Sequence, residues 1–290
     1  MTTRFAPSPT GGLHLGHALS AITGYEIARQ HHGRFLLRIE DIDATRCRPE
    51  YEAEIHDVLA WLGLTWETPV LRQSEHMATY IAAAGRLAAL GLLYPCFATR
   101  GEIQTAAKPG ATDPDGAPLY PGLHRDLPPD QIARRKAEGQ AFGIRLDMGK
   151  AIAVARAKAG AVAFGFDELD GAGSVRRVAI DPARWGDVIL QRKEVPTSYH
   201  LSVVVDDARQ GVTLVTRGVD LRPATDVHRL LQILLDLPDP VYLHHPLLTG
   251  ADGRKLAKST AATSLADMRR AGLTPADVRR LIGLEPDTPT

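Results

Sequence analysis

The first third of the chain alternates short apolar runs with longer segments in which apolar residues recur every three or four positions. A strand-like start at "TTRFA" leads through a loop rich in glycine and proline into a segment that predicts a helix from about Gly16 to His32. The apolar run "GRFLLRIEDID" predicts a second strand, so this part forms a strand–helix–strand unit. Open α/β sheets bind nucleotides at the first strand-to-helix turn of such a unit.

Two further helices are predicted in "PEYEAEIHDVLAWLGL" and "MATYIAAAGRLAALGLL". In the first of them Ile55, Val58, Leu59 and Leu62 are spaced to share one buried face. The α/β rhythm then stops near Cys96, where a loop-rich tract begins.

Three segments follow that tract: the amphipathic segment "PPDQIARRKAEGQ", the short strand-like segment "FGIRLDM" and the Ala-rich segment "KAIAVARAKAGAVAF". Together they predict an inserted module. The rhythm resumes with "DVILQRK", "SYHLSVVVDDARQ", the strand "VTLVTRG" and the helix "TDVHRLLQILLDL". We expect a first catalytic half over 1–95, the module over 96–185, a second catalytic half over 186–259 and a helical segment over 260–290.

The composition is that of an ordinary soluble globular protein, long enough to bury a sizeable core. Its 34 basic and 34 acidic side chains cancel, so any contact with nucleic acid must come from a local patch. Cys47 and Cys96 give no disulfide framework and fit a reducing cytoplasm. We see no signal peptide, and the apolar runs are too short to cross a bilayer, so we expect a cytoplasmic protein with no membrane partner.

The stretch "HLGH" places His14 and His17 three residues apart, which puts both imidazoles on one face of the helix. Gly11, Gly12 and Gly16 allow the chain to pass close to a bulky ligand, and a helix start offers unpaired N–H donors. This combination suits a phosphate. Taken alone, a His-x-x-His pattern more often belongs to a surface or to packing.

A second basic motif, "KLAKS", follows "TGADGR" near the other end and contains Lys255 and Lys258. Taken alone it is a solvated basic loop. Together, "PSPTGGLHLGH" and "KLAKS" resemble the two signature motifs of the class I aminoacyl-tRNA synthetases. The resemblance implies an α/β fold, in which a Rossmann-like parallel sheet carries an inserted α+β acceptor-type module and a short C-terminal helical tail.

The resemblance also implies ATP with Mg²⁺ as cofactors and charge stabilisation at the α-phosphate as the main catalytic task. The implied ATP-binding residues are His14, Gly16, His17, Asp220 and Lys258, and the implied catalytic residues are His14, His17, Lys255 and Lys258.

The stretches "RFAPSPTG" and "RIEDID" resemble the glutamyl-tRNA synthetase branch of that class. The resemblance implies that L-glutamate is bound by Arg4, Phe5, Ala6, Pro7, Ser8, Glu40, Tyr199 and Arg217. Two carboxylates and one ammonium suit guanidinium forks and a carboxylate, with Arg4 or Arg217 on the side-chain carboxylate and Glu40 on the ammonium.

Plainer interpretations stay open for several of these residues. Arg4 and Glu40 can form an internal ion pair, and Tyr199 can be a core residue with a satisfied hydroxyl. For Asp206 and Asp207 in "VVVDD" we expect helix-end caps.

The chain ends soon after "KLAKS", whereas glutamyl-tRNA synthetases continue into an anticodon-binding domain. Nearly the whole chain, including "SYHLSVVVDDARQGVTLVTRGVDL", resembles the glutamyl-Q tRNA(Asp) synthetases. The resemblance implies tRNA-independent formation of glutamyl-adenylate, followed by transfer of glutamate to the cyclopentenediol of queuosine at the wobble position. The implied partner is the anticodon stem-loop of queuosine-containing tRNA(Asp). The alternatives are a truncated synthetase that charges tRNA(Glu) and a non-catalytic tRNA-binding paralogue.

Members of this family often hold zinc in the insertion with the pattern Cys-x-Cys, then Tyr-x-x-x-Cys. Here Cys96, Tyr120 and His124 remain, while Ala98 occupies the second position. A structural zinc site needs four ligands, so we expect the module to bind no zinc and to be held by packing. The basic tracts "RRVAIDPARWGDVILQRK" and "DMRRAGLTPADVRRL" can contact tRNA phosphates, although solvated faces are the plainer interpretation.

Overall fold

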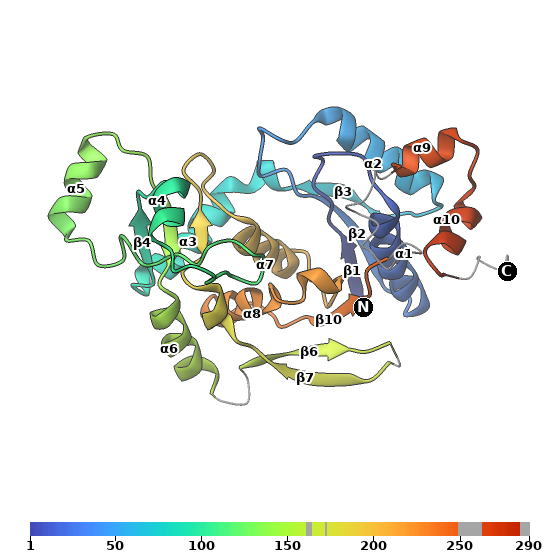
Figure 1. The fold of residues 1–290 in the computed structure, drawn as a ribbon. Coiled ribbons are helices and arrows are strands. Elements are labelled where there is room, and N and C mark those ends of the chain that lie inside the picture. The colour runs from blue at the N-terminus through green and yellow to red at the C-terminus, as the bar shows by residue number, and fades with distance from the viewer. Residues whose placement is uncertain (161–163, 172, 249–262, 285–290) are drawn as a thin grey trace.

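The computed structural model of the chain describes residues 1–160, 164–171, 173–248 and 263–284 (Figure 1). Two sheets meet edge to edge and form its central layer. In spatial order the strands of this layer are β3 (Glu67–Arg72), β2 (Arg34–Ile39), β1 (Thr2–Phe5), β9 (Leu214–Gly218), β10 (Val241–His245), β6 (Gly165–Leu169) and β7 (Val175–Ala179). The two sheets meet at β1 and β9, where the amide of Thr213 donates to the carbonyl of Thr2 at 2.9 Å.

The chain builds this layer in two directions from the β1–β9 boundary. The strands β2 and β3 extend it to one side, and β10, β6 and β7 extend it to the other. All pairings are parallel except that of β6 with β7. The loops that leave the carboxyl ends of β1 and β9 therefore diverge, and such a switch point is where open α/β sheets bind ligands.

The predicted strand–helix–strand unit is confirmed, with α1 (Leu15–Gln30) between the parallel strands β1 and β2. The helix ends two residues before the predicted His32. In α2 (Pro49–Trp61) the predicted face is also confirmed, because Ile55, Val58 and Leu59 are buried in the core cluster that α1 lines. The helices α3 (Met77–Ala89), α7 (Tyr199–Arg209) and α8 (Thr225–Leu234) pack together in a second cluster. Short 3₁₀ turns are η1 (Gln73–His76), η2 (Pro182–Trp185) and η3 (Val219–Leu221).

The inserted module carries its own antiparallel sheet, formed by β4 (Leu93–Cys96), β5 (Gly143–Leu146) and β8 (Ile189–Gln191). Its helices are α4 (Arg100–Ala106), α5 (Pro129–Ala137) and α6 (Met148–Ala159). The carboxylate of Asp187 holds the parts together, because it accepts from the Tyr94 hydroxyl at 2.5 Å, from Arg125 at 2.7 Å and from the Met148 amide at 2.9 Å.

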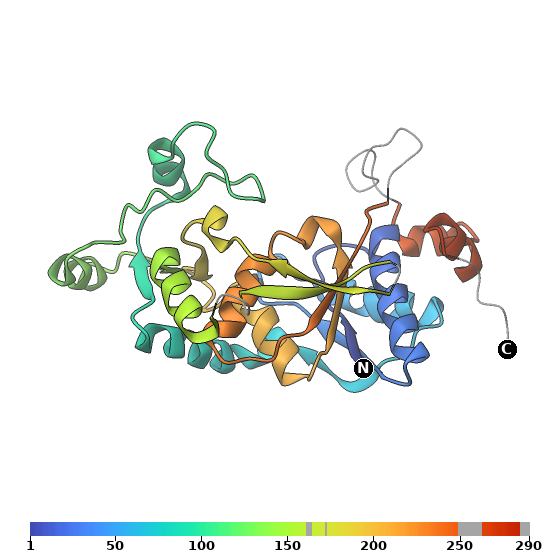
Figure 2. The same cartoon turned by 90° about the horizontal axis from the view of Figure 1, so that it is seen from below.

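The pairing of strands does not follow the predicted division at residue 185. The strands β6 and β7 precede this residue but belong to the central layer, whereas β8 follows it and pairs with β5 of the module. The cause for β6 is visible in the core, where Phe166 lies edge-on to Tyr242 of β10 with ring centroids 5.4 Å apart. Figure 2 shows the β6–β7 hairpin lying along the central layer.

The predicted helical tail is confirmed as α9 (Leu265–Arg270) and α10 (Pro275–Leu281). Leu265 and Val278 are fully buried against the α1–α2 cluster, and Arg279 forms an ion pair with Glu26 of α1. The two helices and the inserted module lie at opposite ends of the central layer (Figures 1 and 2). In the described ranges, no helix has the length and apolar character needed to cross a membrane.

Gly24 allows α1 to lie close to β9, because a Cβ there would stand 2.9 Å from Thr216 Oγ1. Thr216 is buried and β-branched, so it has little freedom to rotate away. We expect Gly24→Ala to lower the free energy of unfolding by about 1–3 kcal/mol, measured by urea denaturation.

The hydroxyl of Thr216 makes no hydrogen bond in the described structure, so Thr216→Ala alone should cost only the roughly 1 kcal/mol of a buried methyl group. In the Gly24→Ala background the same substitution should restore stability. An unchanged stability of Gly24→Ala would show that the close approach of α1 is not required.

Candidate functional site

The start of α1 is built by the two histidines of "HLGH". His14 is the N-cap residue, and its Nδ1 accepts from the amide of Gly16 at 3.1 Å, while His17 Nδ1 accepts from the amide of His14 at 3.1 Å. The centroids of the His14 and His17 rings lie 3.8 Å apart. An accepting Nδ1 places the proton of a neutral ring on Nε2, so each ring carries an Nε2–H donor. Burial and the neighbouring His14 lower the pKa of His17 to about 4, which keeps this ring neutral near pH 7.

The structure thus brings His14, Gly16 and His17 together, as the sequence predicts. A Cβ on Gly16 would stand 3.0 Å from Cε1 of His14, so the glycine gives this ring its position. Phe5, at the end of β1, lies edge-on to His17 with ring centroids 6.5 Å apart. The histidine pair therefore lies beside the loop that leaves β1.

Beneath that loop, four charged side chains form a buried chain of alternating sign. Arg4 Nε donates to Asp207 Oδ1 at 3.0 Å. Arg38, which is fully buried in β2, donates from Nη1 to the same oxygen at 2.8 Å and from Nη2 to Glu40 Oε1 at 3.1 Å. Arg4 and Glu40 do not pair with each other, but the plainer interpretation holds in that each forms an internal ion pair, Arg4 with Asp207 and Glu40 with Arg38.

Asp206 and Asp207 are not helix-end caps, and this expectation was wrong. Both lie within the last turn of α7 and are buried, and the helix ends at Arg209 with Gln210 as its C-cap. Asp206 accepts from the Tyr80 hydroxyl at 2.8 Å and from Gln73 Nε2 at 2.9 Å. Two acids directly after the apolar "LSVVV" face inward because buried hydrogen-bond donors meet them there.

Arg38 and Asp207 are therefore two residues of this site that the sequence reasoning missed. Burial raises the pKa of Asp207, but Arg4 and Arg38 outweigh it and hold the pKa below the usual value. For Glu40, burial wins over the attraction of Arg38 and raises the pKa. Its amide donates to the carbonyl of Pro7 at 3.0 Å, which fixes Glu40 against the loop after β1.

Arg217, at the end of β9, is buried among neutral partners. It donates to His228 Nδ1 at 3.1 Å, to Thr225 Oγ1 at 2.7 Å and to His244 Nε2 at 3.3 Å. In the parts of the chain that the structure describes, no carboxylate forms an ion pair with it. A buried guanidinium with only neutral partners retains an unbalanced charge, which a bound anion would compensate.

Tyr199 lies at the start of α7, with its ring 5.4 Å from that of His228. The alternative of a core tyrosine with a satisfied hydroxyl is wrong, because within the described ranges nothing hydrogen-bonds to that hydroxyl. Burial raises the pKa of the Tyr199 hydroxyl. The positive charge of Arg217 lowers this pKa, and the negative charge of Glu40 raises it, but burial has the largest effect. The hydroxyl is therefore protonated near neutral pH and able to donate to a ligand.

The imidazoles that hydrogen-bond to Arg217 have further hydrogen-bond partners of their own. His228 Nε2 lies 3.2 Å from His200 Nδ1, and His244 Nδ1 lies 2.8 Å from Glu168 Oε1. Burial and the charge of Arg217 lower the pKa of His200 and of His244 to about 4. Both rings are neutral near pH 7, so they can accept and relay hydrogen bonds without adding positive charge.

The remaining predicted residues have different surroundings. Phe5 and Pro7 are buried, Ala6 is half-buried and Ser8 is exposed, so the loop presents Ser8 to solvent. Asp220 lies in η3, and a Cβ on Gly218 would stand 2.5 Å from its Oδ1. Lys255 and Lys258 lie outside the described residues.

The three remnants of the zinc pattern also come together. The Cys96 thiol lies 3.4 Å from the Tyr120 hydroxyl and 3.8 Å from His124 Nδ1. That nitrogen accepts from the amides of Phe97 and Ala98, both at 3.2 Å, so it is occupied by the backbone. In the part of the chain that the structure describes, no group of three His, Cys, Asp or Glu side chains is placed to hold a metal.

Comparison with known proteins identifies the class. The family of class I tRNA synthetases for Glu and Gln, catalytic domain, matches residues 1–285. A glutamate tRNA ligase structure from Elizabethkingia meningosepticum aligns with a TM-score of 0.74 at 24% identity, over 97% of this chain and 60% of that one, and supports the fold. The fold and the site thus define a class I aminoacyl-tRNA synthetase catalytic domain.

Two curated proteins narrow the family. A glutamyl-Q tRNA(Asp) synthetase of Rhodobacter capsulatus is 48% identical over 98% of this chain and 100% of that protein. One of Nocardia farcinica is 41% identical over 99% of this chain and 86% of that protein. The chain belongs to the glutamyl-Q tRNA(Asp) synthetase family of ligases.

Removal of the carboxylate that Arg4 and Arg38 share should weaken glutamate binding, because Arg4 then loses its described ion-pair partner and Arg38 keeps only Glu40. We expect Asp207→Asn to raise the KM for glutamate in ATP–pyrophosphate exchange at least tenfold, with the KM for ATP within about twofold, and to cost about 3–5 kcal/mol of stability. Asp187→Asn, which removes a buried partner of Arg125 in the module, should lower stability without a change in the KM for glutamate. A normal KM for glutamate in folded Asp207→Asn would contradict the role of this network.

Acid should destabilise the protein between about pH 6.5 and pH 4. The folded pKa of His17, His200 and His244 is about 4, below the unfolded value of 6.5, so the unfolded chain binds more protons in this window and stability falls as the pH falls. Each histidine should contribute up to about 1.4 kcal/mol per pH unit in urea unfolding experiments. His200→Gln should reduce the slope, and a free energy of unfolding that stays constant from pH 7 to 4.5 would refute the assignment.

Proposed function

We propose that the chain activates L-glutamate with ATP and transfers it to a hydroxyl of the cyclopentenediol of queuosine, at the wobble position of tRNA(Asp). The observation that carries the choice of amino acid is Arg217, a buried cation whose hydrogen-bond partners among the described residues are neutral and which shares its neighbour His228 with Tyr199. It would bind the side-chain carboxylate, while Glu40 binds the ammonium and Arg4 and Ser8 complete the pocket. The choice of RNA acceptor is supported by the Rhodobacter relative, which matches over its full length.

In the first step, a carboxylate oxygen of glutamate attacks the α-phosphorus of ATP, and the bond to pyrophosphate breaks. The Nε2–H groups of His14 and His17 and the amides at the start of α1 would donate to the phosphates as negative charge develops. Asp220, Lys255 and Lys258 are proposed to complete the ATP site. Mg²⁺ would arrive on the ATP phosphates, since this ion keeps most of its waters and favours phosphate oxygens.

In the second step, the queuosine hydroxyl attacks the carbonyl carbon of glutamyl-adenylate and the bond to AMP breaks. The hydroxyl proton leaves with the AMP phosphate or to solvent. The acyl group is already activated, so the work of the protein is to orient the hydroxyl at short distance. A reaction between two small intracellular substrates and tRNA would take place in the cytoplasm.

A second candidate function is the charging of tRNA(Glu). A glutamate–tRNA ligase of Parasynechococcus marenigrum is 39% identical over 93% of this chain, which covers 55% of that protein. A non-catalytic tRNA-binding role has less support, because it would not require the neutral histidine pair or the buried cation Arg217.

Transfer of labelled glutamate tests the proposal. With ATP and Mg²⁺, we expect label on tRNA(Asp) that carries queuosine and none on matched tRNA(Asp) that carries guanosine. Periodate cleavage of the cyclopentenediol should abolish the transfer. Label on tRNA(Glu) alone would favour the second candidate, and glutamate-dependent ATP–pyrophosphate exchange with no labelled RNA would overturn the choice of acceptor.

A further inference from the structure

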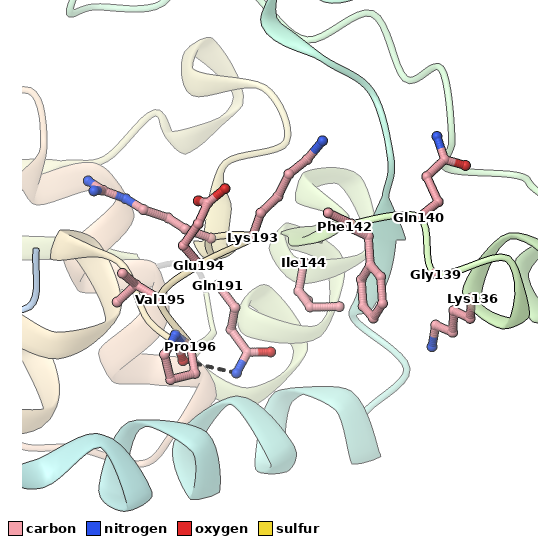
Figure 3. Close-up of a pocket in the computed structure, with 12 residues that line it drawn as sticks. Lys136, Gly139, Gln140, Phe142, Ile144, Gln191, Lys193, Glu194, Val195 and Pro196 are labelled. Carbon is pink, nitrogen blue, oxygen red and sulfur yellow. Dashed lines mark hydrogen bonds between the residues drawn. The ribbon is translucent and has the colours of Figure 1, made fainter. Parts of the chain in front are cut away.

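A hollow of about 470 Å³ lies on the inserted module (Figure 3). It is bounded by the end of α5, by β5 and by residues 191–196, a segment that begins at the last residue of β8. Its lining includes four residues with apolar side chains, called its floor here, namely Phe142, Ile144, Val195 and Pro196. Two hydrogen bonds fix the wall: Gln191 Nε2 donates to the Pro196 carbonyl at 3.0 Å, and the Arg192 amide donates to the Val195 carbonyl at 2.8 Å. The hollow is therefore shaped by ordered chain on both sides.

The rim of this hollow is cationic. Lys136, Arg192 and Lys193 line it against the single acid Glu194. Lys136 Nζ lies 4.8 Å from the centroid of the Phe142 ring, and Lys193 Nζ donates to the Phe97 carbonyl at 3.2 Å. Neither lysine forms an ion pair with a described residue. Arg192 pairs with Asp43, so the positive charge that has no ion-pair partner among the described residues comes from Lys136 and Lys193.

An apolar floor with a cationic rim matches the two parts of a nucleotide. A base is flat and stacks on apolar or aromatic side chains whatever its identity, and a phosphate is attracted to lysine and arginine. The volume lies within the range of about 300–1,000 Å³ that binds small ligands. A purely apolar ligand would leave the lysines without a role, and a free anion would leave the floor without one.

The hollow is also joined to the glutamate site by two stretches of chain. The wall segment 191–196 runs on within three residues to Tyr199. On the other side, Arg192 Nη1 pairs with Asp43 Oδ2 at 3.3 Å, and Asp43 lies three residues after Glu40. The hollow and the residues proposed to bind glutamate therefore lie on neighbouring stretches of the chain.

We propose that this hollow binds one nucleotide of the RNA substrate, a close neighbour of the nucleotide that receives glutamate. The base lies against Phe142 and Pro196, and the phosphates face Lys136 and Lys193. The inference rests on the proposed function in one respect, namely that the substrate is RNA.

Binding of a fluorescent anticodon stem-loop RNA to the full chain, followed by anisotropy over a range of salt concentrations, tests this site. Lys136→Gln combined with Lys193→Gln should raise the Kd at least tenfold at low salt and reduce the salt slope by about 1–2, because two phosphate contacts are lost. The matched control is Arg134→Gln combined with Lys150→Gln, which removes two exposed cations of α5 and α6 outside the hollow. An equal loss in both double variants would mean that only total charge matters, and would overturn the proposal.

Crosslinking gives an independent measurement on the wild-type chain. A stem-loop that carries 4-thiouridine at one loop position at a time should crosslink from one position to the tryptic peptide 137–145, which contains Phe142 and Ile144. The absence of such a crosslink from every position, with binding intact, would also overturn the proposal.

Two further readouts separate this inference from the proposed function. Glutamate-dependent ATP–pyrophosphate exchange should stay within about twofold in both double variants, because neither touches the adenylate site. If the pocket variant weakens RNA binding but no RNA accepts glutamate, the proposed acceptor is wrong and the nucleotide site stands. If the wild type glutamylates RNA and the pocket variant matches its control, the nucleotide site is wrong.

Discussion

The site depends on a single buried chain of charges in which Asp207 sits between Arg4 and Arg38, and Arg38 reaches on to Glu40. Its members come from β1, β2 with the loop that follows it, and the end of α7, so one electrostatic unit ties both halves of the central layer together. Burial of so many charges is tolerated only because each has a hydrogen-bonded partner of opposite sign. The same pairing fixes the directions of Arg4 and Glu40 before any ligand binds, and a ligand then meets groups that have already lost their freedom to move.

Arg217 differs from Arg4 and Arg38 in the charge of its partners. Its partners are two imidazoles and a hydroxyl, and burial keeps the pKa of both histidines below the usual value, so among the described residues no carboxylate pairs with its charge. One arginine of the site is thus neutralised by the protein and the other is not. This asymmetry leaves positive charge at the β9 end of the site, whereas the charges of Arg4, Arg38, Asp207 and Glu40 balance one another.

The sequence predicted the parts of this architecture that depend on local order. Periodicity located α1 and α2, and the glycine-rich loop with two histidines indicated the helix start that could meet a phosphate. It did not predict what depends on contacts between distant segments. The pairing of β6 with β10 and of β8 with β5 crosses the expected module boundary, and the inward direction of Asp207 depends on Arg4, some two hundred residues earlier. The family resemblance pointed to Tyr199 and Arg217 as candidate glutamate-binding residues, but only the structure shows that the described partners of Arg217 are neutral.

The two histidines at the start of α1 have one more consequence. An ordinary capping box ends in a glutamate or glutamine, and a glutamate there would place a negative charge among the first amides of the helix and repel any phosphate. Here imidazole nitrogens accept the same kind of hydrogen bond while both rings can remain uncharged and keep a donor on the far edge. The capping hydrogen bonds stabilise the first turn of α1, and no acidic side chain of that turn neutralises its positive potential. The motif is thus a capping device that leaves the helix dipole available to a triphosphate.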